Sequence, residues 1–207
     1  VFTPRGDVAT VRFLKEDGYT IGTYSIPIPE QNSDGKRTQK TGFPFPDNLS
    51  DIYLSKDGTS LVQIQKEGGR SIITVSDVKN TVKKELLQHP FESWLPFMVG
   101  NTVYLQTKAS AFAGGFLYQV DTARKNLIKI LGDIPGLTVS ISPKGEYLLY
   151  SESRNGGFVS KIKNMKTKAE NALSINVLPE KCIWLGSEDS ICAGQSFLQE
   201  ATYPDDW

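Results

Sequence analysis

Few residues in this chain could do chemistry. The sequence contains one histidine, His89, and two cysteines, Cys182 and Cys192. A Ser-His-Asp or Cys-His nucleophilic site would have to use His89, and a metal site built from several histidines is ruled out. His89 stands in Gln88-His89-Pro90, between two predicted repeats, where a single histidine is typical of a solvated turn. We therefore predict no catalytic residue, no metal ligand and no cofactor-binding residue.

The two cysteines flank a predicted turn. The segment between and including them reads CIWLGSEDSIC, and a hairpin centred near Ser187 places Cys182 directly opposite Cys192. Paired antiparallel residues have Cα atoms about 4.5 or 5.5 Å apart, and a disulfide accepts about 4.4–6.8 Å. A disulfide here would favour an extracytoplasmic setting, periplasmic or at the cell surface. The alternative is two reduced cysteines packed as small apolar residues, as the cytoplasm would require.

Other catalytic motifs are absent from the sequence. It holds no Gly-x-Ser-x-Gly elbow, no phosphate-binding loop before a helix, no Cys-x-x-Cys pair and no calcium-loop spacing of carboxylates. Two carboxylates for glycoside cleavage would come from distant repeats, and the sequence selects no pair. Asn48-Leu49-Ser50 has the pattern of a glycosylation sequon, which matters in a secreted eukaryotic protein.

Charge and hydropathy limit the partners. The 23 basic and 23 acidic side chains balance, so the chain lacks the basic field that nucleic-acid binding uses. The lysines between Lys161 and Lys168 are typical of a solvated hairpin edge. No run approaches the roughly 20 apolar residues of a membrane helix, so we predict no transmembrane segment within the chain. A protein partner fits best.

Aromatic residues offer two candidate roles. Trp94 and Trp184 fall at equivalent repeat positions, which favours packing over sugar stacking. The end of the chain differs, because acidic and aromatic residues gather there in a predicted loop. They form either a binding rim or an anchor for further sequence: Tyr203, Asp205, Asp206 and Trp207.

Two series of turns show how these residues are positioned. Gly-Gly pairs recur every 42 to 46 residues, the period of a propeller blade: Gly68-Gly69, Gly114-Gly115 and Gly156-Gly157. A second series keeps the same spacing: 55–58, 98–101, 142–145 and 187–190. Segments between the turns are rich in β-branched, aromatic and apolar residues, as in strands. Each repeat therefore reads as a four-stranded antiparallel meander, and such sheets need neighbours to cover their faces.

The predicted fold is an all-β propeller with three complete blades and a half-blade at each end. The boundaries are 1–26 (half-blade, strands c and d), 27–48 (loop between blades), 49–87, 91–131 and 136–175 (blades), 180–197 (half-blade, strands a and b) and 198–207 (loop). We expect a fragment of a larger propeller. The alternative is a four-bladed ring in which the two half-blades pair.

One segment resembles a known repeat. Ser142-Pro143-Lys144-Gly145-Glu146-Tyr147-Leu148-Leu149-Tyr150, followed by Arg154-Asn155-Gly156-Gly157, is similar to the WD-like repeat of TolB-type propellers, and residues 54–58 are a looser copy. The resemblance implies the fold more than the function, because such propellers serve as scaffolds, peptidase gates and enzymes. We expect a non-catalytic interaction or scaffold module of an exported or cell-surface protein. The alternative is the accessory or catalytic propeller of a hydrolase, polysaccharide-active or peptidase-gating.

Overall fold

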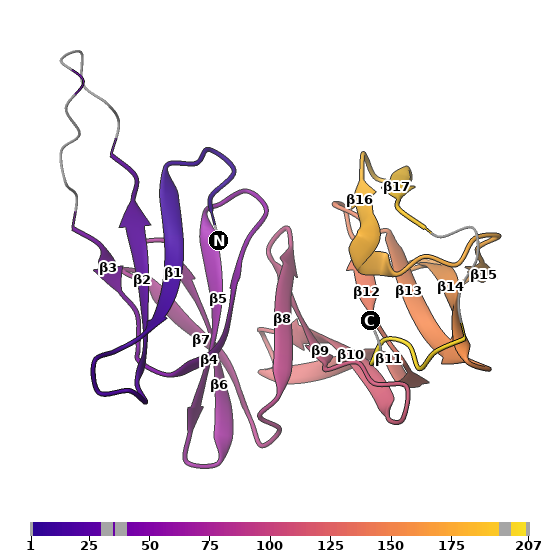
Figure 1. Cartoon of the computed structure of the whole chain (residues 1–207), viewed down its shortest axis with the longest axis horizontal. Coiled ribbons are helices and arrows are strands. Elements are labelled where there is room, and N and C mark those ends of the chain that lie inside the picture. Colours follow the sequence, from indigo (N-terminus) through magenta and orange to yellow (C-terminus); the bar gives the residue numbers. More distant parts are fainter. Residues whose placement is uncertain (1, 30–34, 36–40, 195–199, 206–207) are drawn as a thin grey trace. The chain divides into compact units, whose positions relative to one another are not determined.

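The chain is almost entirely β-structure in the computed structural model, which describes residues 2–29, 35, 41–194 and 200–205 (Figure 1). Its strands follow one another as hairpins, and the helical structure in these residues is one 3-10 turn, η1 (Pro179–Lys181). The all-β prediction is confirmed. The chain divides into two compact units, residues 1–98 with 120–126 and residues 99–119 with 127–207.

The first unit holds two antiparallel sheets. One has the order β1-β2-β3, with strands β1 (Val8–Leu14), β2 (Ile21–Pro27) and β3 (Phe43–Pro44). The other is a meander of β4 (Leu49–Leu54), β5 (Ser60–Glu67), β6 (Arg70–Asp77) and β7 (Lys83–His89). Phe45, Leu49, Leu54 and Leu61 form a core cluster in this unit.

The other two predicted repeats are also four-stranded meanders. The middle one comprises β8 (Trp94–Val99), β9 (Thr102–Thr107), β10 (Gly114–Asp121) and β11 (Asn126–Pro135). The next comprises β12 (Val139–Ile141), β13 (Tyr147–Arg154), β14 (Gly157–Asn164) and β15 (Glu170–Ala172). A two-stranded hairpin follows, made of β16 (Cys182–Trp184) and β17 (Ser190–Cys192).

Two turns of the second series, those that begin at Ser55 and Ser142, share a local structure. At the β4–β5 turn, the Ser55 N–H donates to the Ser60 carbonyl and the Gly58 N–H donates to the Ser55 carbonyl, both at 2.8 Å. Ser55 Oγ also accepts from the Ser60 N–H at 2.9 Å. The same three bonds recur around Ser142 at the β12–β13 turn. Gly58 and Gly145 have φ values of 73° and 75°, a conformation that favours glycine.

The Gly-Gly pairs recur at the predicted period, but glycine is needed for different reasons at different pairs. Gly68-Gly69 forms the two-residue β5–β6 turn with positive φ at both residues, whereas the matching β13–β14 turn is Asn155-Gly156, one residue earlier than predicted. Gly114-Gly115 is not a turn, because it begins β10 without positive φ. A Cβ on Gly115 would lie 2.7 Å from the Cβ of Leu137, so close packing requires glycine there.

The predicted loop 27–48 needs correction. Its end forms β3, in which Phe43 lies opposite Ser25 of β2, and the Phe45 N–H donates to the Thr23 carbonyl at 3.0 Å. The first sheet therefore has a third strand that the predicted half-blade 1–26 lacked. Pro44 is tolerated because β3 is an edge strand. Residues 30–34 and 36–40 of the loop lie outside the described residues.

Buried serines join strands to the segments between sheets. Ser71 Oγ on β6 donates to the carbonyl of Phe91 at 2.7 Å. Ser160 Oγ on β14 donates to the carbonyl of Val177 at 2.6 Å and accepts from the Val177 N–H at 2.7 Å. Both serine side chains are inaccessible to solvent. These hydroxyls thus satisfy backbone groups of the connections that leave β7 and β15.

Candidate functional site

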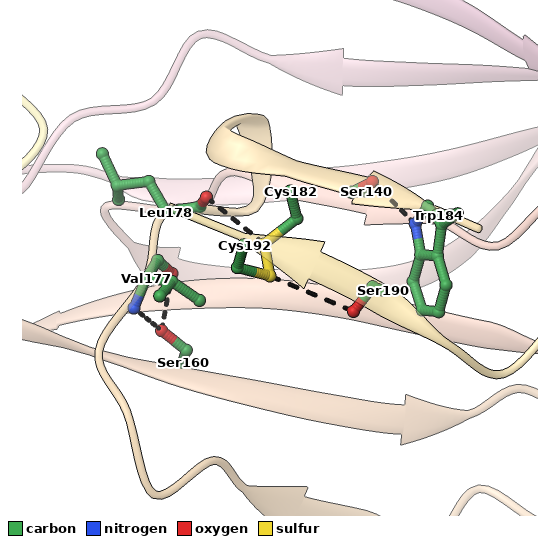
Figure 2. The surroundings of a disulfide bond; sticks show 8 residues. All are labelled: Ser140, Ser160, Val177, Leu178, Cys182, Trp184, Ser190 and Cys192. Carbon is green, nitrogen blue, oxygen red and sulfur yellow. Dashed lines mark hydrogen bonds between the residues drawn. A yellow bond between two sulfur atoms is a disulfide. The ribbon is translucent and has the colours of Figure 1, made fainter. Parts of the chain in front are cut away.

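The β16–β17 hairpin carries the two cysteines of the chain. Its register places Cys182 opposite Cys192, with Cα atoms 4.0 Å apart, and a disulfide joins the two residues (Figure 2). The Leu185 N–H donates to the Asp189 carbonyl at 2.9 Å and closes the turn. The short strands are thus joined covalently at one end and by the turn at the other.

The two faces of this hairpin have different environments. Trp184 is buried, and its indole N–H donates to Ser140 Oγ on β12 at 2.9 Å (Figure 2). Ile183 and Ile191 lie directly opposite each other on the other face. The exposed fractions of Ile183, Leu185 and Ile191 are 72%, 65% and 62%. We call these three residues the apolar hairpin face.

The sequence contained a signal for this face that our prediction did not use. Ile183 and Leu185 alternate with Cys182 and Trp184, so apolar side chains stand on both faces of a two-stranded sheet. One face packs through Trp184, and nothing among the described residues buries the other. A surface of this kind marks an interaction site more often than a scattered apolar residue does.

The predicted rim at the end of the chain is only partly a surface. Tyr203 is 7% exposed and packs edge-on against Phe158, with 5.2 Å between ring centroids, so it belongs to a core cluster. Asp205 is exposed, and its Oδ2 accepts from the Ala111 N–H at 2.6 Å. Asp206 and Trp207 lie outside the described residues.

Beside this segment lies an open polar hollow of about 530 Å³. Its walls come from the β13–β14 turn and from two connecting segments, and include Arg154, Asn155, Asn176 and Glu200. The Ala201 N–H donates to the Gly156 carbonyl at 2.9 Å and holds residue 200 beside the turn. The hollow offers a cation, an anion and two amides, a set suited to hydrogen bonding with a polar ligand.

His89 is not a solvated turn residue. It is the last residue of β7 and lies opposite Ser71. Its Nδ1 accepts from the Phe91 N–H at 3.1 Å, and its ring meets Trp94 edge-on at 5.4 Å. Burial lowers the pKa of His89, because desolvation disfavours the charged ring. These contacts give the side chain a structural role.

The structure also places the other residues that the sequence singled out as candidates for packing or modification. Trp94 in β8 and Trp184 in β16 are both buried. The sequon residue Asn48 uses its side-chain oxygen to accept from the Ile21 N–H at 2.8 Å. No group of three or more His, Cys, Asp or Glu side chains in the described ranges could hold a metal ion. Over those same ranges, no helix has the length and apolar character to cross a membrane.

Comparison with known proteins identifies the fold. No protein-family model matches the chain, and neither does any curated protein. Among solved structures, TolB from Acinetobacter baumannii matches with a TM-score of 0.52 and 15% identity, over 86% of this chain and 44% of its own. A putative TolB from Agrobacterium tumefaciens matches with a TM-score of 0.54 and 15% identity, over 83% and 62%. This chain has a TolB-like β-propeller fold.

The same fold occurs in other classes of protein. The acylaminoacyl peptidase of Pyrococcus horikoshii matches with a TM-score of 0.55 and 12% identity, over 82% of this chain and 30% of the peptidase. The structural similarity establishes the fold, whereas sequence identities this low leave the function open. The chain spans 44% and 62% of the two TolB chains, and our expectation that it is a fragment of a larger propeller stays a prediction.

Proposed function

We propose that this chain is a non-catalytic protein-interaction module of an exported or cell-surface protein. The observation that carries the proposal is the β16–β17 hairpin, a disulfide-linked pair of strands that presents Ile183, Leu185 and Ile191 to solvent. Disulfides persist in oxidising compartments, which supports an extracytoplasmic location.

The apolar hairpin face has the physical character of a binding surface. Full burial of one isoleucine or leucine side chain contributes about 1.5–3 kcal/mol, so covering all three supplies several kcal/mol to an association. The disulfide lowers the entropic cost of binding, because the hairpin is held in one conformation before the partner arrives. We expect the partner to be a protein with a complementary apolar surface.

Site-specific crosslinking in the full-length protein tests this proposal. A photoreactive residue at position 185 should yield one protein adduct in the native host, whereas the same residue at the exposed turn position Glu188 should yield none. Ile183→Asp should abolish the adduct at 185, because it places a charge within the apolar face. An adduct that survives Ile183→Asp, or no adduct at 185, would refute the assignment.

A thiol count tests the compartment separately. In protein isolated from its host and denatured without reductant, Cys182 and Cys192 should both resist thiol labelling, and both should be labelled after reduction. Labelling of both cysteines before reduction would place them in a reducing compartment and refute the exported location.

The alternative function is the propeller of a hydrolase. The structural likeness to the Pyrococcus horikoshii acylaminoacyl peptidase favours a peptidase-associated propeller over a polysaccharide-active one. Full-length protein that hydrolyses blocked peptides or polysaccharides would support this alternative.

A further inference from the structure

A second hollow, in the first unit, is independent of the hairpin. It encloses about 390 Å³, and residues from four segments line it: Asp7 and Val8 at the start of β1, Ser25 and Ile28 at the end of β2, Phe43 in β3 and Lys79 in the β6–β7 turn. We call it the Phe43 hollow. Its lining combines one carboxylate, one ammonium group, an aromatic ring and aliphatic side chains.

Hydrogen bonds fix the walls of the Phe43 hollow. Thr3 Oγ1 donates to Asp7 Oδ1 at 2.5 Å, and the Ile28 N–H donates to the Asp7 carbonyl at 2.7 Å. Asn80 Nδ2 donates to the Pro44 carbonyl at 2.9 Å, so the turn that carries Lys79 is tied to β3. A site held by bonds of this kind needs little reorganisation when a ligand binds.

The two charges of the hollow are available to a ligand. Neither Asp7 nor Lys79 makes an ion pair with another described residue, and both are exposed. Lys79 Nζ lies 6.0 Å from the centroid of the Phe43 ring, at the limit of a cation–π contact. The bond from Thr3 lowers the pKa of Asp7, so this carboxyl is an anion at neutral pH.

We propose that the Phe43 hollow binds a small zwitterion, an α-amino acid or dipeptide with an apolar side chain. Its ammonium group pairs with Asp7, its carboxylate with Lys79, and its side chain packs on Phe43 and Val8. Opposite charges within one lined hollow select a ligand that carries both signs, and the ring and aliphatic wall select against polar side chains. The volume accommodates either an amino acid or a dipeptide.

Calorimetric titration of the full chain with defined probes tests this proposal. L-Leucine and L-alanyl-L-leucine distinguish the two ligand lengths, and at least one of them should bind. About 0.5 kcal/mol per heavy atom gives a Kd of about 0.5 mM for leucine and of about 7 μM for the larger dipeptide. N-acetyl-L-leucine lacks the ammonium group and L-leucinamide lacks the carboxylate. Each should bind about tenfold more weakly than leucine, which corresponds to about 1.4 kcal/mol.

Variants locate the binding. Asp7→Asn should lose affinity for leucine and not for leucine derivatives without an ammonium group, and Lys79→Met should lose affinity for ligands with a carboxylate. Lys144→Met, an exposed lysine of the β12–β13 turn, is the matched control and should leave the Kd unchanged.

Two results would overturn the proposal. One is a titration with up to about 20 mM of either zwitterion that releases or absorbs no heat and causes no change in the NMR chemical shifts of the Val8 and Ile28 amides. That concentration is some fortyfold above the Kd expected for leucine. The other is binding that Asp7→Asn and Lys79→Met leave unchanged, since the ligand would then lie elsewhere on the chain.

Discussion

The disulfide allows a quantitative prediction for the second unit. Cys182 and Cys192 are ten residues apart, and closing a loop of that length in the unfolded chain stabilises the folded state by about 2.7 kcal/mol in the chain-entropy model. The double variant Cys182→Ser/Cys192→Ser should lose this contribution. Because the second unit contains about 100 residues, its melting temperature should fall by about 10–20 °C.

Calorimetry with and without reductant provides the assay. Reduction of the wild-type protein should lower the same transition by the same amount, whereas reductant should not change the double variant. Ser190→Ala, on the same hairpin, should melt as the wild type does. A shift below about 2 °C on reduction would refute the reasoning, because the bridge would then contribute far less than its loop length requires.

Three further predictions concern single positions. Ser160→Ala should destabilise the protein by about 2–3 kcal/mol in urea titrations, because both backbone groups of Val177 lose a buried partner; equal midpoints for variant and wild type would contradict this. Gly115→Ala should cost about 2 kcal/mol or more through the 2.7 Å approach to Leu137, whereas Gly186→Ala, with open space around it, should be near neutral. Burial lowers the pKa of His89, so its contribution to stability should be fully present above pH 6.5 and be lost as the pH falls through the lowered folded pKa; His89→Gln should flatten that part of the pH profile, and an NMR titration midpoint at or above 6.5 would contradict the pKa direction.

Local turn chemistry made most strands predictable. In the turns that begin at Ser55 and Ser142, the serine makes hydrogen bonds with backbone groups only a few residues away, and the glycine adopts the positive φ that the turn needs. The spacing of these residues along the sequence therefore predicts where the hairpins lie. Gly114-Gly115 kept that spacing for a different reason, the approach of a distant segment at Leu137, which no local pattern encodes. β3 was missed because Pro44 argues against a central strand, and only tertiary pairing shows that it lies at an edge.

The candidate surfaces depended more on tertiary structure. Tyr203 stands among acidic residues in the sequence, and its burial results from Phe158 and Leu178, which lie far along the chain. The pairing of Cys182 with Cys192 followed from ten-residue spacing around a turn, whereas the Phe43 hollow combines segments from residues 7 to 79. Spacing can predict contacts across one hairpin, but it does not predict which segments meet between sheets.

The buried serines also bear on how a repetitive chain avoids misassembly. Successive meanders have similar lengths and turns, so a strand could pair out of step or with a neighbouring repeat. A slip of β14 by one residue would replace Ser160 with Lys161 or Val159 on the inner face. The lysine would be buried without its partner Glu152, and the valine would leave Val177 without its two hydrogen bonds. A small hydroxyl at this position therefore discriminates between the native alignment and its nearest competitors during folding, apart from its contribution to the stability of the finished sheet.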